Sequence, residues 1–99
     1  MIEDLIKTIR ERKNLSSDKS YTSSLLSGGL SKCIDKLEEE FNELKDALNS
    51  KNNQVHESAD VIYHLLVALE AADVKFEDVL KELEKRKRQS GIEEKKDRE

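Results

Sequence analysis

KLEEEFNEL at residues 36–44 and HESADVIYHLLVAL at residues 56–69 decide the fold. Each segment carries two carboxylates three residues apart, Glu40 with Glu43 in the first and Glu57 with Asp60 in the second. On an α-helix that spacing places both carboxylates on one side, one turn apart. Four or five carboxylates brought together repel each other unless a cation lies among them. The pattern therefore indicates a site for a hard cation with oxygen ligands.

The first segment belongs to an expected helix over 30–48. At about 100° per residue its apolar residues form one stripe, and its acidic residues with Lys36 form another roughly 130° away. Glu39 lies close enough in angle to join the first acidic pair. A solvated acidic face is the commoner explanation of such a stripe. The apolar stripe consists of Leu30, Ile34, Leu37, Phe41, Leu44 and Leu48.

The second segment belongs to an expected helix over 58–72, SADVIYHLLVALEAA, which is apolar on nearly all sides. Such a helix must be buried on most of them. Acidic residues in its first turn could simply complement the helix dipole, which is worth roughly a few tenths of a kcal/mol. That explanation does not account for a matching acidic set one short hairpin upstream.

A short polar turn over 49–53 separates the two helices, so we expect them to run antiparallel. Glu43 lies six residues before this turn and Glu57 four residues after it. The two acidic pairs should therefore face one another at a similar height along the hairpin.

Three shorter amphipathic helices are expected around this hairpin. The first starts near Ile2 and ends at a basic cluster of Arg10, Arg12 and Lys13. This cluster could bind phosphate or could be an ordinary charged helix end. A second, over 21–26, has Ser20 as its N-cap and lies in a hydroxyl-rich stretch that could bind phosphate or be a surface connector. The last starts near Phe76 and is expected to end at Ser90 and Gly91.

A chain of 99 residues makes one domain with little core for its long helices. We expect a single domain over 1–88 and a charged, disordered tail over 89–99. Short neighbours cannot cover a helix as apolar as the one over 58–72, so a homodimer that shares a helical bundle is expected. The predicted fold class is all-α with about five helices.

Composition excludes several classes of function. Charged residues make up 40% of the chain but the net charge is only −4, which indicates no nucleic-acid partner. The longest apolar run is interrupted by His64 and Glu70, so no membrane span is expected. The single Cys33 excludes an internal disulfide and favours a reducing, cytoplasmic location.

SYTSSLL at 20–26, together with the two segments above, resembles the phosphoribosyl-ATP pyrophosphatase family. That family belongs to the MazG-like all-α nucleoside triphosphate pyrophosphohydrolases. The resemblance implies hydrolysis of phosphoribosyl-ATP to phosphoribosyl-AMP and pyrophosphate, the second step of histidine biosynthesis. It also implies Mg²⁺ as the cofactor, with Mn²⁺ as a substitute, and a helical dimer. The cyclohydrolase of the next step would then be on a separate chain.

The resemblance also assigns roles to residues by motif. The implied metal ligands are Glu40, Glu43, Glu57 and Asp60. Glu39 and Glu40 are the implied catalytic residues, with Glu39 as a further ligand or as the base that orients water. Lys36 would meet a phosphate. The residues that would help to hold the phosphates of the substrate are Arg12, Lys13, Ser20, Tyr21 and Thr22.

Two other functions remain open at this stage. A related enzyme that clears non-canonical nucleoside triphosphates would share the metal site. A non-catalytic helical dimer would carry the same acids merely as solvated charges. His64 could reach the edge of the site or be hydrogen-bonded inside the bundle. Phe41, where the family commonly has a small residue, is interpreted as packing.

Overall fold

The computed structural model describes residues 1–16 and 18–88, which form five α-helices and no strand. The all-α prediction is confirmed for this part of the chain. The expected tail over 89–99, with Ser90 and Gly91, lies outside the described residues. The helices are α1 (Ile2–Arg12), α2 (Tyr21–Ser27), α3 (Gly29–Ser50), α4 (Gln54–Ala71) and α5 (Phe76–Lys87).

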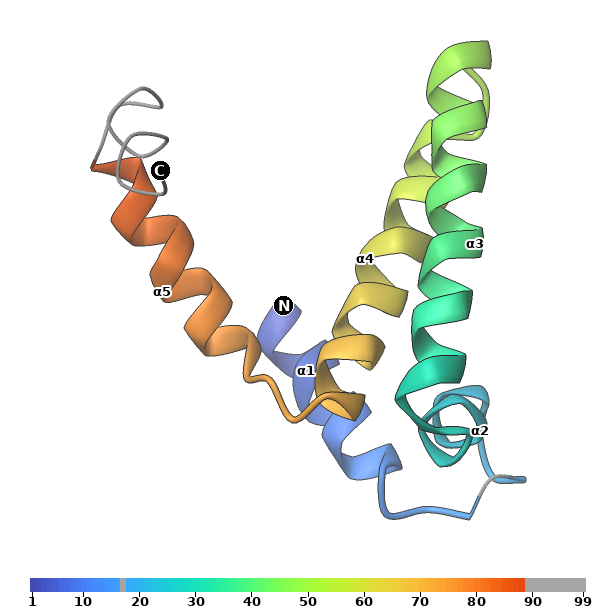
Figure 1. The fold of residues 1–99 in the computed structure, drawn as a ribbon, viewed down its shortest axis with the longest axis vertical. Helices are drawn as coiled ribbons and strands as arrows, with labels where there is room; N and C mark the ends of the chain where they lie inside the picture. The colour runs from blue at the N-terminus through green and yellow to red at the C-terminus, as the bar shows by residue number, and fades with distance from the viewer. Residues whose placement is uncertain (17, 89–99) are drawn as a thin grey trace.

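The two longest helices, α3 and α4, form the predicted antiparallel hairpin (Figure 1). The turn over 51–53 places Lys51 and Asn53 in the left-handed region, with φ of 59° and 57°. Asn tolerates this conformation better than most residues. Helix α4 begins at Gln54, four residues before the expected start, so that Glu57 lies in its first turn.

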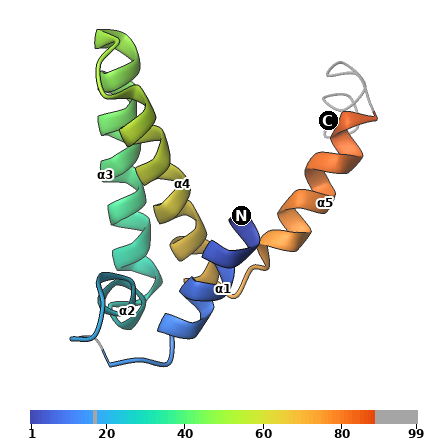
Figure 2. The same cartoon turned by 180° about the vertical axis from the view of Figure 1, so that it is seen from behind.

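The core lies at the end of the hairpin far from its turn, where α1 and α2 pack (Figures 1 and 2). Ser20 caps α2, as predicted, because its side chain accepts a hydrogen bond from the backbone N–H of Ser23. The short helices thus close the open end of the hairpin. The buried apolar cluster consists of Ile6, Ile9, Leu25, Cys33, Leu66, Val67 and Ala68.

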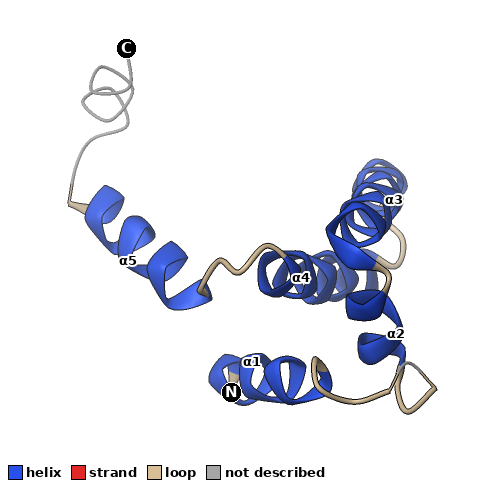
Figure 3. Ribbon diagram, turned by 60° about the horizontal axis from the view of Figure 1, so that its bottom comes forward, coloured by secondary structure: helices blue, strands red, loops and turns tan. Residues whose placement is uncertain are grey.

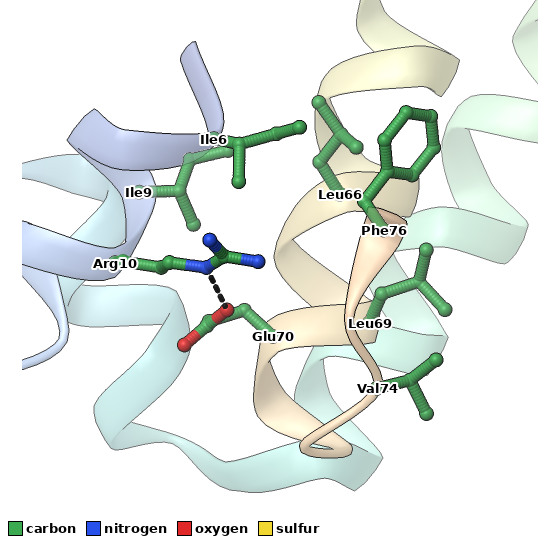
Figure 4. A pocket seen from close by; sticks show the side chains of 8 residues that line it. All are labelled: Ile6, Ile9, Arg10, Leu66, Leu69, Glu70, Val74 and Phe76. Carbon is green, nitrogen blue, oxygen red and sulfur yellow. Dashed lines mark ion pairs between the residues drawn. The ribbon is translucent and has the colours of Figure 1, made fainter. Parts of the chain in front are cut away.

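Helix α5 extends away from the other helices and has no buried residue (Figure 3). Its first residue, Phe76, packs against the core where α1 meets the end of α4. The side chains at this junction leave a cavity of only about 10 Å³, and Arg10 forms an ion pair with Glu70 beside it (Figure 4). Within the described residues, no helix combines the length and the apolar character needed to cross a membrane.

The chain covers only part of its own predicted apolar stripe on α3. Ile34, Phe41 and Leu48 are 48%, 59% and 54% exposed, so the interpretation of Phe41 as packing is wrong within one chain. Helix α4 packs instead on the adjacent face of α3, where Cys33 and Ala47 are buried. Residues one position further along point about 100° away from that face. Helix α4 itself leaves Ile62 and Leu65 exposed.

Candidate active site

The two acidic pairs face each other across the hairpin, as their spacing from the turn predicts. Glu40 and Glu43 come from α3, and Glu57 and Asp60 come from the first two turns of α4. One oxygen from each of the four carboxylates lies within 4.8 Å of the other three. Four convergent carboxylate oxygens are the ligand type that hard divalent cations prefer.

Two carboxylate oxygens of these four acids are buried. Among the described residues, the Oε2 atoms of Glu40 and Glu57 have no hydrogen-bond partner. Burial raises the pKa of Glu40, and the adjacent Glu43 carboxylate raises it further. Burial also raises the pKa of Glu57, with Glu43 again the next cause. A buried carboxylate oxygen without a partner is unfavourable, so the site fits a cation placed among the four acids.

The other residues predicted from α3 lie at the edge of this cluster. Lys36 Nζ lies 3.4 Å from Glu39 Oε2, and this contact raises the pKa of Lys36. Glu39 remains largely exposed and is not one of the four convergent carboxylates. The edge of the cluster therefore carries an ion pair between Lys36 and Glu39, outside the four convergent carboxylates.

His56 is a candidate ligand that sequence reasoning missed. Its Nε2 lies 3.3 Å from Asp60 Oδ2, and His56, Glu57 and Asp60 form a second group that could hold a metal ion. The four-residue spacing of His56 and Asp60 on one helix face was a signal that could have identified it.

The hydroxyl residues of α2 contact α4 near the acids. Thr22 is buried, and its Oγ1 is hydrogen-bonded to the hydroxyl of Tyr63. The Tyr21 hydroxyl lies 3.2 Å from Nε2 of His64, whose Nδ1 lies 2.8 Å from the backbone oxygen of Asp60. His64 is thus hydrogen-bonded inside the bundle, the more conservative of its two predicted roles. Tyr21 is half-exposed.

The basic cluster at the end of α1 is partly occupied by ion pairs. Lys13 Nζ lies 3.0 Å from Asp73 Oδ1 and 3.7 Å from Glu70 Oε1. Arg12 accepts a hydrogen bond from Ser23 through its backbone oxygen. Within residues 1–16 and 18–88, no ion pair of the Arg12 guanidinium is found. The structure thus brings the four acids together and leaves Arg12 and Lys13 on a different part of the fold.

Comparison with known proteins extends over nearly the whole chain. The family model described as phosphoribosyl-ATP pyrophosphohydrolase matches residues 2–87. A phosphoribosyl-ATP pyrophosphatase of Rhizobium etli is 41% identical over 99 residues, covering 98% of this chain and 92% of the relative. A protein of the same name from Ruegeria pomeroyi is 44% identical over 97 residues, covering 96% of this chain and 92% of the relative.

A third relative, from Roseobacter denitrificans, carries the same name and is 43% identical over 99 residues, covering 98% of this chain and 94% of its own. No solved structure matches the chain. The family resemblance seen in three short motifs is thereby confirmed over nearly the full length of the chain, and the matched range contains the four convergent acids. The chain belongs to the phosphoribosyl-ATP pyrophosphohydrolase family.

Proposed function

We propose that this protein hydrolyses phosphoribosyl-ATP to phosphoribosyl-AMP and pyrophosphate, the second step of histidine biosynthesis, and that it requires Mg²⁺. The observation that carries the cofactor is the pair of buried oxygens on Glu40 and Glu57 without partners in the described residues. The family and the names of its relatives support the substrate. A cytoplasmic location is favoured by the single, unpaired Cys33.

The four acids would hold the cation, with Glu40 and Glu43 on one side and Glu57 and Asp60 on the other. Bound Mg²⁺ supplies positive charge that neutralises the phosphoanhydride oxygens, and Mn²⁺ could substitute for it. Magnesium usually keeps several waters and binds through few carboxylates, which suits a site that is open on one side. Glu39, exposed at its edge, would orient or deprotonate the attacking water.

Charged groups at the edge of the cluster and at the end of α1 would hold the phosphates of the substrate. Lys36 belongs to the same helix as Glu40 and Glu43, and its only ion pair among the described residues is with the exposed Glu39. Arg12 offers a guanidinium that can bind a phosphate in a bidentate manner. Lys13 could contribute only after releasing Asp73 and Glu70. We therefore propose Lys36 and Arg12 as the principal phosphate contacts.

We also propose a homodimer. The exposed residues Ile34, Phe41 and Leu48 repeat every seven residues along α3, and Val55 and Ile62 do the same on α4. A seven-residue apolar repeat is typical of a seam between helices. Phe41→Asp should convert the dimer to a monomer in light scattering. Asn42→Asp, on the exposed residue beside it, should leave the mass unchanged.

The decisive experiment measures pyrophosphate release from phosphoribosyl-ATP with Mg²⁺ and with a chelator, beside the same assay on ATP and on damaged nucleoside triphosphates. Release from phosphoribosyl-ATP that chelation abolishes is the expected result. Equal or faster release from other triphosphates would replace the histidine-pathway assignment with nucleotide clearance. Absence of release from every substrate would favour a non-catalytic helical dimer.

A further inference from the structure

A chain of hydrogen bonds links the exposed ring of Tyr21 to the backbone of the acidic helix. The Tyr21 hydroxyl lies 3.2 Å from His64 Nε2, and His64 Nδ1 lies 2.8 Å from the backbone oxygen of Asp60. His64 is only 5% exposed, and its ring packs edge-on against Tyr21 and Tyr63. Its orientation is therefore set from both sides.

The chemistry of these groups fixes the direction of each hydrogen bond. A backbone carbonyl only accepts, so His64 Nδ1 must carry the proton that it donates to Asp60. In a neutral imidazole the other nitrogen is then an acceptor. The Tyr21 hydroxyl must donate to Nε2, and its proton is committed to His64.

The Tyr21 oxygen consequently has only lone pairs left to offer to a ligand. His64 links the phenol to the backbone of Asp60, one of the four acids, and Lys36 and Glu40 act on the phenol electrostatically. Phosphate oxygens are acceptors, as this phenol oxygen is, so the two do not form a hydrogen bond. The group that meets Tyr21 must bring its own O–H or N–H.

Ser20 shows the same restriction. The Ser23 hydroxyl donates to the backbone oxygen of Arg12 at 2.8 Å, so in its 2.8 Å contact with Ser20 Oγ it is the acceptor. The Ser20 hydroxyl therefore donates its hydrogen bond to the oxygen of Ser23. Two of the three hydroxyls predicted to hold phosphates thus have their protons committed within the protein.

We propose that His64 is a positioning residue that accepts the hydrogen bond of the Tyr21 hydroxyl and so leaves the Tyr21 oxygen as an acceptor for a sugar hydroxyl of the substrate. This inference rests on the proposed function. The ribose rings of phosphoribosyl-ATP carry hydroxyl donors and adjoin the phosphates that the acidic cluster would bind through its cation. Tyr21 would then select the sugar, while Lys36 holds a phosphate.

The first test observes the tautomer of His64 directly in the protein without substrate. Long-range ¹H–¹⁵N NMR should show a protonated Nδ1 and a bare Nε2. Tyr21→Phe should shift the Nε2 resonance, because it removes the donor. Tyr63→Phe is the matched control, since its hydroxyl contacts Thr22 and not His64. A proton on Nε2, with or without one on Nδ1, would overturn the inference.

The second test compares kinetics with substrate analogues that each lack one ribose hydroxyl. Tyr21→Phe should lower kcat/KM for the full substrate about two- to tenfold, mainly through KM, as expected for one neutral hydrogen bond. With the analogue that lacks the partner hydroxyl, the same substitution should have no effect. An equal loss with every analogue, or no loss with an active wild type, would overturn the inference. Inactivity of the wild type would instead overturn the proposed function.

The third test asks whether His64 acts through Tyr21. His64→Leu should lower kcat/KM in the wild type but cause no further loss in a Tyr21→Phe background. His64→Gln keeps an acceptor and should retain more activity than His64→Leu. Equal additional loss in both backgrounds would mean that His64 is merely structural. If the buried substitutions prevent folding, Tyr21→Phe with the analogue series still decides the question.

Discussion

Acidic residues lie at both ends of α4, but the charged groups around them differ. At the C-terminal end, Glu70 lies 3.5 Å from Arg10 and 3.7 Å from Lys13. At the N-terminal end, Glu57 meets the carboxylates of α3, and the only ion pair of these four acids among the described residues is the contact between Asp60 and His56. At the C-terminal end, basic side chains from the N-terminal segment thus pair with the acid of α4. In the part of the chain that the structure describes, the acids at the other end have no lysine or arginine partner.

The pKa values of the two regions shift in opposite directions. Burial and the neighbouring Glu43 raise the pKa of Glu40. Just beyond α4, a hydrogen bond from Arg10 lowers the pKa of Glu77 to about 2. Charge is therefore unfavourable at the first site and favourable at the second, which is the expected difference between a ligand site and a structural ion pair.

The largest expected effect comes from removing one charge from the acidic cluster and, for comparison, one from the paired end of α4. Glu40→Gln should lower pyrophosphate release roughly 100-fold or more, because a cation ligand is lost. Glu70→Gln removes the same charge from the paired end and should retain activity, with a stability loss of about 1 kcal/mol or less. The assay is pyrophosphate release with chemical denaturation alongside. Comparable losses of activity in both variants would show that the two ends do not differ in function.

The next effect concerns stabilisation by the cation itself. Mg²⁺ at about 100 times its dissociation constant should stabilise the wild type by about 2.7 kcal/mol, because it binds only the folded chain. Glu40→Gln should lose most of this stabilisation, whereas Glu70→Gln should keep it. Thermal unfolding with a magnesium titration measures both. Equal stabilisation of the two variants would place the cation away from Glu40.

Sequence spacing predicted the acidic centre because both pairs lie on single helices joined by a short turn. Three-residue spacing fixes a common face, and the distances of Glu43 and Glu57 from the turn fix their relative height. The Tyr21–His64 contact could not be predicted, since it depends on how α2 packs across the end of the hairpin. The exposure of Phe41 depends on which face of α3 the second helix covers, and apolar periodicity does not specify that choice.

A smaller effect should appear in how the folding stability of the metal-free protein depends on pH. Glu40 and Glu57 have folded-state pKa values above the ordinary 4.5. Their contribution to stability is therefore fully present below pH 4.5 and is lost as the pH rises through the raised values. Denaturation in a chelator, followed as the pH is raised above 4.5, should show a decline in stability that Glu57→Gln reduces. If the decline in stability is the same in that variant, groups other than Glu57 cause it.

The smallest effect is the loss of stability in acid that comes from the ion pair between Arg10 and Glu77. The lowered pKa of Glu77 means that its contribution is present above pH 4.5 and is lost as the pH falls through about 2. Glu77→Gln should weaken that acid dependence in circular dichroism at low salt. Asp78→Asn is the control, because its contact with Lys81 is 3.9 Å long. Since Glu77 is exposed, added salt should reduce the difference. A difference that survives high salt would indicate that Arg10 anchors α5 by geometry as well as by charge.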